Sequence, residues 1–171
     1  IENFLDVAHF PFVHGGYLGV KERPEISDYE AEITPEGVVA RNVRVYQPNG
    51  YGDGQPAEVA YTYKAIRPLT AYLRKESPKQ TLSIIVFVTP HDLVDSTAFM
   101  IMAENYMNGS PAEDLVAFQD TIFGQDAPIL RSQRPELLPL DLQAELHLRS
   151  DRTAITYRKW LSQLGLTIGA A

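Results

Sequence analysis

The sequence contains no cysteine, and it has only four histidines. It therefore holds no disulfide and offers no thiolate to an iron–sulfur cluster. The longest apolar run, residues 82–88 with one serine inside, is far shorter than the about 20 residues that span a bilayer. Acidic residues outnumber basic ones by 22 to 15, which gives a net charge of −7. This charge argues against a nucleic-acid partner and against an anionic membrane surface.

The length is that of a single domain. A chain of 171 residues buries about 70% of its unfolded surface, enough for one sizeable core. No secretory signal opens the sequence, and the first residue is Ile1 rather than methionine. We therefore expect a cytoplasmic protein, and we interpret the chain as a piece of a longer one.

The middle of the chain is predicted to form strands. Six stretches are rich in β-branched and aromatic residues or alternate in polarity: 28–33, 38–46, 59–67, 71–74, 81–89 and 96–105. No helical pattern separates them, so the prediction is an antiparallel meander, and a doubly wound sheet is excluded. The glycine-rich stretch 48–56 lacks a βαβ context and is interpreted as a connection rather than a phosphate cradle. Residues 138–148 alternate cleanly and predict a seventh, half-buried strand, with His147 and the turn residue His91 at the surface.

A helix is predicted after residue 110, and it carries a candidate ligand. Ser110-Pro111-Ala112-Glu113 reads as a capping box with proline at the first helical position. Asp126 lies on the apolar stripe formed by Leu115, Phe118, Ile122, Phe123, Ile129 and Leu130. An ionised carboxylate on a buried face is costly unless it is paired or bound to a metal. Asp120, Glu113 and Asp114 are expected in solvent. The alternative for Asp126 is a buried aspartate that caps a kink near Pro128.

A last helix is predicted to begin at Ser150 or Asp151, which would cap it. Its apolar positions are Ala154, Ile155, Trp160, Leu161 and Leu164. A curved antiparallel sheet closed by a long C-terminal helix is an α+β fold of the helix-grip (START/SRPBCC-like) type. Such a fold leaves a pocket between sheet and helix, with Phe87, Phe99, Ile101 or Met102 as candidate lining residues. Their direction is open, because a one-residue slip in register reverses each assignment.

The first fourteen residues carry the chemistry. Ile1, Phe4, Leu5 and Ala8 form a helical stripe, while Asn3, Asp6 and His9 are spaced three apart on a neighbouring face. In a straight helix His14 would point about 140° away from His9, but a break at Pro11 would turn it back. Two neutral imidazoles and a carboxylate suit a divalent transition metal. The alternative is a pair of ordinary hydrogen-bonded histidines.

This ladder, Asn-x-x-Asp-x-x-His-x-x-x-x-His, resembles the iron-binding segment of the alpha subunit of Rieske-type non-haem iron oxygenases. The local sequence is most similar to the vanillate O-demethylase branch, in the segments Glu2-Asn3-Phe4-Leu5-Asp6 and His9-Phe10-Pro11-Phe12-Val13-His14. The resemblance extends from residue 1 to about Trp160, and it also implies the helix-grip fold.

The resemblance implies a catalytic domain in which His9, His14 and Asp126 hold Fe(II), with O2 and a small aromatic substrate nearby. The implied reaction is hydroxylation or O-demethylation with release of formaldehyde. Electrons would come from a reductase or ferredoxin through a [2Fe–2S] Rieske cluster held by two Cys and two His. That cluster belongs to an N-terminal domain absent from this chain, and a neighbouring subunit of a homotrimer would present it. Asp6 would bridge the two centres, with Asn3 as a weaker supporting residue.

Two other functions stay open at this level. A helix-grip domain can be a metal-free binder of a hydrophobic ligand, with the ladder serving only as hydrogen bonds. It can also be a structural subunit of a larger oxygenase assembly. The sequence leaves the substrate, and the choice between mono- and dioxygenation, undetermined.

Overall fold

A six-stranded antiparallel sheet is the main element of the computed structural model, which describes residues 1–92, 95–106, 109–167 and 169–170. The strands follow one another in the order β1-β2-β3-β4-β5-β6, so each pairs with its neighbour in the chain. Their bounds are Glu30–Thr34, Gly37–Gln47, Ala57–Arg67, Thr70–Glu76, Thr81–Pro90 and Ser96–Glu104. The predicted antiparallel meander is confirmed, strand by strand, to within a few residues.

Tight turns and one irregularity set the register of the first strands. Gly37 closes the β1–β2 turn with φ +131°, and a Cβ there would lie 2.0 Å from the Ala65 carbonyl oxygen, so only glycine fits. The β2–β3 ladder shifts register between Ala40 and Val43, with Asn42 at φ 57°. This bulge explains why residues 38–46 showed mixed faces in the sequence.

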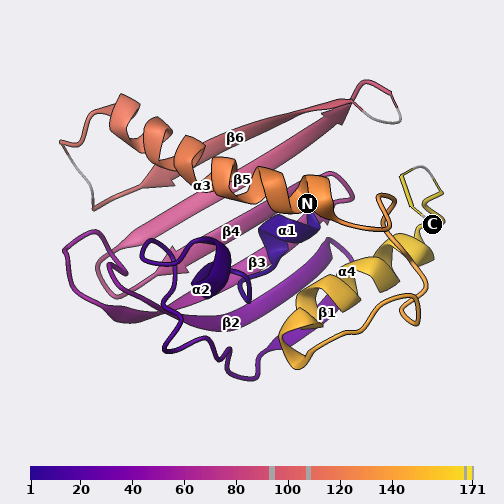
Figure 1. Ribbon diagram of the computed structural model, residues 1–171, viewed down its shortest axis with the longest axis horizontal. Coiled ribbons are helices and arrows are strands. Elements are labelled where there is room, and N and C mark those ends of the chain that lie inside the picture. The colour runs from indigo at the N-terminus through magenta and orange to yellow at the C-terminus, as the bar shows by residue number, and fades with distance from the viewer. Residues whose placement is uncertain (93–94, 107–108, 168, 171) are drawn as a thin grey trace.

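The helices of the described residues lie on one face of the curved sheet (Figure 1). They are α1 (Glu2–Leu5), α2 (Phe10–Val13), α3 (Ala112–Ser132) and α4 (Arg152–Gln163), the last preceded by the 3-10 turn η1 (Arg149–Asp151). The C-terminal helix α4 contacts β1 and β2, while α1 contacts β3 and β4. The longer α3 runs along the β5–β6 side of the same face (Figure 1). The helix-grip fold is therefore confirmed. The sheet is covered by two successive helices, α3 and α4, whereas the sequence predicted closure by one long C-terminal helix.

The core lies between the sheet and helices α1, α2 and α4. Alternate residues of β2, β3 and β4 point into it, as the period of two requires. It is completed by Leu5 and Phe10 at the N-terminus and by Tyr157, Trp160 and Leu161 of α4. The Tyr29 hydroxyl fixes the start of α4, because it donates to the Ser150 carbonyl at 2.6 Å and accepts from the Thr153 backbone N–H at 3.0 Å. None of the helices in the described ranges is long and apolar enough to cross a membrane.

The predicted seventh strand at 138–148 is wrong. Apart from a bridge between Leu138 and Ala170 this segment is irregular, and Leu146 is 90% exposed. It fastens to α4 instead of to a sheet edge: the Arg158 guanidinium donates to the Pro139 carbonyl and to the Glu145 carboxylate. Alternating polarity can give a segment one apolar face, but it does not provide a neighbouring strand with which the segment could pair. His147 is also not freely solvated, since its Nε2 is shielded and has no hydrogen-bond partner among the described residues.

The helix starts differ from the prediction in their capping. The α3 helix begins one residue later than expected, with Pro111 at the N-cap, and no side-chain cap from Ser110 is present. Asp151 is the N-cap of α4 as predicted, but its carboxylate accepts from the Leu148 N–H before the helix. The predicted stripe of α3 is largely exposed, and Asp126 is its buried residue.

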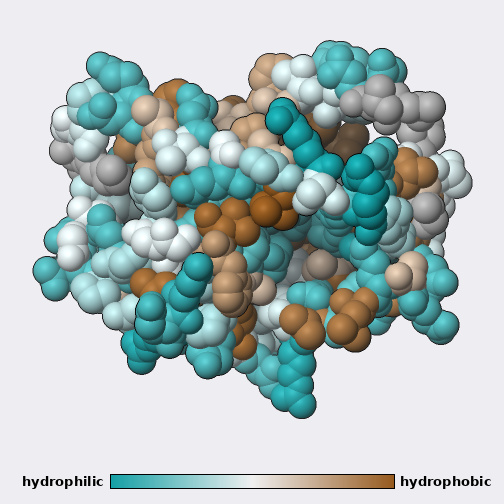
Figure 2. Space-filling view, in the orientation of Figure 1, coloured by the Kyte–Doolittle hydropathy of each residue, from teal (hydrophilic) through white to brown (hydrophobic). Residues whose placement is uncertain are grey.

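Only one of the four candidate pocket residues faces the core. Met102 packs against the core cluster, so Phe87, Phe99 and Ile101, at odd positions of β5 and β6, point to the opposite face. Phe99 and Ile101 are accordingly 55% and 60% exposed. Hydrophobic atoms also reach the surface near the middle of the helix-covered face, where polar side chains surround them (Figure 2).

Candidate metal centre

Asp6 organises the turn that places both histidines. Helix α1 ends at Leu5, and the Asp6 carboxylate then accepts hydrogen bonds from the backbone N–H of Ala8 at 2.9 Å and of His9 at 3.2 Å. This is the turn-forming habit of aspartate, which competes with helix continuation. The predicted break at Pro11 is therefore wrong in position, because the helical stripe already ends at Asp6.

Pro11 instead lies in the first turn of the second helix, α2, directly after Phe10. A missing N–H costs nothing in this position. His9 is the N-cap and His14 the C-cap of this single turn, and His14 has φ −110° and ψ 34°. Both residues flank α2 and do not lie within it. The angle of about 140° expected between their side chains in a straight helix therefore does not apply. The turn brings the two imidazoles face to edge, with ring centroids 5.0 Å apart.

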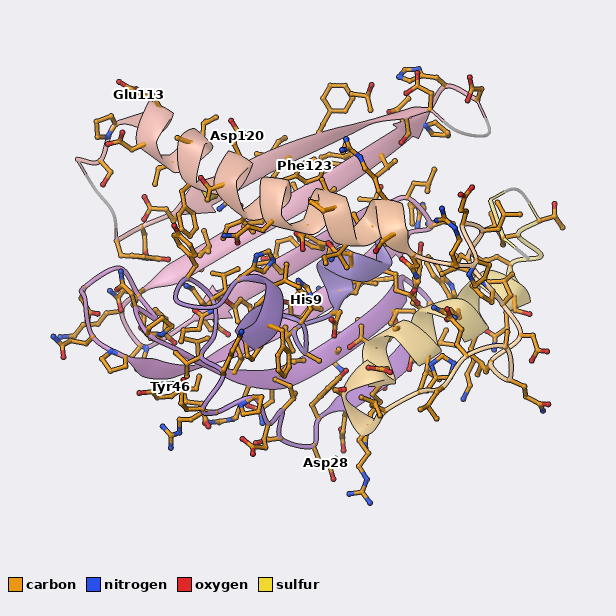
Figure 3. The ribbon with its side chains drawn as sticks, viewed as in Figure 1. His9, Asp28, Tyr46, Glu113, Asp120 and Phe123 are labelled. Atoms are coloured by element: carbon orange, nitrogen blue, oxygen red, sulfur yellow. The ribbon has the colours of Figure 1, made fainter. Side chains whose placement is uncertain are left out.

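Three polar atoms converge beside this turn. His9 Nε2 lies 3.2 Å from His14 Nε2, and the Asp126 Oδ1 atom lies 3.5 Å from the first and 3.1 Å from the second. Asp126 comes from α3, more than a hundred residues later, and both His14 and Asp126 are buried. Figure 3 places His9 beneath the middle of α3, between the two short N-terminal helices, with Asp120 and Glu113 on the outer side of α3.

The outer nitrogens of both rings are already engaged. His9 Nδ1 lies 2.7 Å from the Asp6 carboxylate, and His14 Nδ1 lies 2.8 Å from Gln125 Oε1. Since a carboxylate and a carbonyl oxygen only accept, each Nδ1 carries the proton in these contacts, and each neutral ring keeps a lone pair on Nε2. Two lone pairs and a carboxylate oxygen then face one another, an arrangement that a shared proton or a metal cation stabilises.

The spacing of these atoms suits a metal ion. A cation about 2.1 Å from two adjacent ligands at right angles holds them roughly 3 Å apart, and the three separations, 3.1, 3.2 and 3.5 Å, lie a little above that value. Two histidines and one carboxylate on one side of an ion form the facial set that leaves open positions for other ligands. The donor atoms and their spacing therefore fit a divalent transition metal.

The electrostatics of the pair His14 and Asp126 point the same way. Burial is the largest single influence and opposes the charged form of each group, but the hydrogen bond and charge attraction between the two groups, together with contacts to Gln125 and Asn3, outweigh it. The pKa of Asp126 is consequently lowered, with help from Asn3, and that of His14 is raised. Asp126 is thus a carboxylate at neutral pH, and the site attracts a positive charge.

Asn3 and Phe10 complete the surroundings. The Asn3 side-chain amide donates to Asp126 Oδ1 at 3.3 Å. Asn3 therefore binds the carboxylate on α3 and does not bind the nearer residue in sequence, Asp6. The Phe10 ring contacts both imidazoles and, on its other side, the buried Tyr61. The hydrogen-bond partners of Asp126 are side chains of the N-terminal segment, which disfavours the alternative in which it caps a kink at Pro128.

The structure separates the candidates clearly. It brings together His9, His14, Asp126, Asp6 and Asn3, all singled out from the sequence. It leaves Asp120, Glu113, Asp114 and His91 at the surface, as expected. Sequence reasoning missed the contact of Gln125 with His14, although the residue stands directly before the predicted ligand. Helical geometry alone gave it no reason to point the same way as Asp126.

A separate hollow of about 420 Å³ does not belong to this centre. Its lining includes Arg23, Tyr46, Arg44 and Glu58, and none of the five residues of the candidate centre takes part in it. The Arg23 guanidinium stacks on the Tyr46 ring at 4.3 Å, and Arg44 pairs with Glu58. Its cations are therefore already occupied by neighbours.

A helix-grip domain with a cluster of two histidines and one aspartate is the class that fold and site define. The chain belongs to the family of vanillate O-demethylase oxygenase C-terminal domains, whose profile matches residues 1–167. It is 39% identical to the probable methylxanthine N7-demethylase NdmC of Pseudomonas sp. (strain TJI-51), over 99% of this chain and 62% of that protein. It is 29% identical to the methylxanthine N1-demethylase NdmA of Pseudomonas putida, over 95% of this chain and 45% of that protein.

Solved structures agree with this assignment. NdmA of Pseudomonas putida CBB5 with caffeine superposes with a TM-score of 0.74 at 25% identity, covering 95% of this chain and 46% of that one. NdmB of the same strain superposes with a TM-score of 0.71 at 21% identity, over 95% of this chain and 44% of that one, which supports the fold alone. The chain thus spans between two fifths and two thirds of the length of these relatives.

Proposed function

We propose that this chain is the catalytic domain of a Rieske-type oxygenase and that His9, His14 and Asp126 hold a ferrous ion. The observation that carries the proposal is the convergence of two imidazole lone pairs and a carboxylate oxygen within 3.5 Å of one another. A metal-free binder of hydrophobic ligands has no use for such a group of acceptors, so the metal-bound function is favoured. Membership of an oxygenase domain family supports the same choice.

The proposed reaction is oxidative demethylation of a small aromatic compound. The bound ferrous ion would supply the activation of O2. Oxygen, two electrons and two protons convert a methyl C–H bond to C–OH and release one water; the resulting hydroxymethyl group then leaves as formaldehyde. Relatives named as methylxanthine demethylases support an N-methylated heteroaromatic substrate, and the family name supports a methoxy-substituted ring as the other candidate.

The residues of this chain prepare the site. Asp126 supplies the negative charge that a divalent cation requires, and Asn3 holds its Oδ1 by a hydrogen bond. Phe10 lies against both imidazoles and so limits water on that side. Asp6 holds the His9 ring, and 26% of its side chain is exposed. We propose that this partly exposed carboxylate also contacts the Rieske domain of a neighbouring subunit, in a homotrimer supplied by a reductase or ferredoxin.

The ligand assignment is tested by metal content. We expect His9→Ala, His14→Ala and Asp126→Ala each to abolish binding of about one ferrous ion per chain after anaerobic reconstitution, while circular dichroism shows a folded protein. The matched control is Asp120→Ala, an exposed aspartate on the same helix. Iron binding by Asp126→Ala at the parental level, together with its loss in Asp120→Ala, would show the assignment to be wrong. A folded parent that binds no iron would favour the metal-free binder.

A further inference from the structure

Helix α3 holds the His14 ring at both of its nitrogens. Gln125 Oε1 lies 2.8 Å from Nδ1, and the next residue, Asp126, places Oδ1 3.1 Å from Nε2. His14 itself is 1% exposed, so in the folded parent protein bulk solvent does not compete with Gln125 for the contact at Nδ1. Two consecutive side chains of one helix therefore fix the direction of a ring that comes from the opposite end of the chain.

The two histidines differ in the charge of their outer partner. His9 Nδ1 faces the Asp6 carboxylate, whereas His14 Nδ1 faces the neutral amide of Gln125. Asp6 and Asp126 together contribute two negative charges, which a divalent cation cancels. A third carboxylate, in place of Gln125 and beside the buried ring, would leave the site with a net negative charge in a poorly hydrated environment.

We propose that Gln125 is a positioning residue for the metal centre. Its carbonyl oxygen accepts the Nδ1 proton of His14, which selects the tautomer with a free lone pair on Nε2 and aims that lone pair at Asp126 and His9. Partners of this kind set the orientation of metal-binding histidines. Because the amide is neutral, it does this without adding charge to the centre. This inference rests on the proposed function.

The test compares variants that keep the size of residue 125 but change its acceptor. Gln125→Met retains the length of the side chain and removes the carbonyl, whereas Gln125→Glu retains an acceptor oxygen. We expect Gln125→Met to lower Zn²⁺ affinity by roughly 10–100-fold and Gln125→Glu to restore it to the parental level or above. Equilibrium dialysis of the full-length protein with elemental analysis measures zinc separately from any iron elsewhere. Gln119→Met is the matched control, because Gln119 is on the same helix and contacts Met102.

A second measurement reports the protonation of the His14 ring instead of the affinity. In the zinc-loaded parent protein, ¹⁵N spectra of labelled imidazoles should show His14 with its proton on Nδ1 and zinc on Nε2. In zinc-loaded Gln125→Met the Nδ1 proton should exchange faster with solvent, and a fraction of the rings should bind zinc through Nδ1. Packing by a side chain of the same size leaves both properties unchanged, so they distinguish positioning from a merely structural role.

The outcomes separate this inference from the proposed function. Zinc binding by the parent with equal binding by Gln125→Met overturns the role of Gln125 and leaves the metal centre intact. A proton on Nε2 of His14 in the zinc-loaded parent, with zinc on Nδ1, overturns it as well, whether or not the variants fold. A parent that binds neither zinc nor iron overturns the proposed function and, with it, the role of Gln125.

Discussion

Lys75 allows a prediction of stability whose sign and size follow from the structure. It lies on β4 with its side chain toward the core face, and it is 6% exposed. Its Nζ donates to the Gly50 carbonyl at 2.6 Å and lies 5.5 Å from the centre of the Tyr51 ring. Among the described residues, no carboxylate forms an ion pair with it. Burial without a counter-charge lowers the pKa of Lys75 from 10.5 to about 8.

The pH dependence follows from proton binding. Between about pH 8 and pH 10.5 the unfolded chain holds a proton on Lys75 that the folded chain has lost, so the free energy of unfolding rises with pH in this window. Below it the folded protein carries the full cost of a buried cation, on the order of 3 kcal/mol, since each pH unit is worth about 1.4 kcal/mol. Above the window the cost disappears.

The perturbation is Lys75→Met, which keeps the aliphatic chain and removes the charge. From about pH 7 to about pH 9.5 we expect the stability of the parent, relative to this variant, to increase by roughly 2 kcal/mol. Urea denaturation of both proteins at several pH values gives the difference, in which tyrosine titrations common to both cancel. The slope is the observable, because the value at one pH also contains the lost hydrogen bond to Gly50.

A matched control removes a lysine that is not buried. Lys79 lies exposed in the turn between β4 and β5, and Lys79→Met should leave a difference that does not vary with pH. If the Lys75→Met difference were equally flat over this range, burial of an unpaired cation on β4 would be the wrong description of this residue.

Two further predictions concern the N-terminal segment. In Asp6→Asn the remaining carbonyl still accepts from His9, so metal content should stay near the parental level while reduction of the iron slows in stopped-flow experiments on the full-length protein; normal electron transfer would exclude the bridging role. Arg158 is 4% exposed and binds Glu2 through two nitrogens, so Arg158→Met should lower the free energy of unfolding by roughly 3 kcal/mol. The exposed pair of Arg41 predicts less than about 1 kcal/mol for Arg41→Met, and equal losses in the two variants would refute this account of Arg158.

The sheet was predictable because its signals are local. Strands β2 to β6 combine β-branched and aromatic residues with turn residues between them, and each pairs with the strand before it. In such a meander the order of strands follows from the order of the sequence, so no long-range information is needed. The register was different: the bulge between Ala40 and Val43 decides which side chains face the core, and nothing in the alternation located it.

The failed strand at 138–148 shows the limit of alternation. Its even-numbered leucines repeat as they would in a half-buried strand, yet Leu146 and Leu148 are exposed. What positions this segment is the buried guanidinium of Arg158, which contacts Glu145 and the Pro139 carbonyl. Arg158 comes thirteen residues after its partner Glu145, and Glu145 lies in an irregular segment. A contact of this kind has no regular spacing in the sequence, so a search for periodic patterns does not find it.

In the candidate site, too, residues close in sequence could be predicted from spacing, whereas the distant Asp126 could not. Spacing identified His9, His14 and Asp6 because these residues are close in sequence, although it placed the chain break at Pro11 instead of at the Asp6 turn. Asp126 was found by a different argument, the cost of a carboxylate on an apolar stripe. That argument led to the residue that joins the two histidines, but through a stripe that is mostly exposed, since the one buried position of α3 is Asp126 itself. A charged side chain more buried than the leucines and phenylalanines beside it needs a partner, and the ferrous ion proposed for the three atoms that meet there would be one. The proposed metal centre would therefore account for the burial of Asp126, whereas hydrophobic packing of α3 does not.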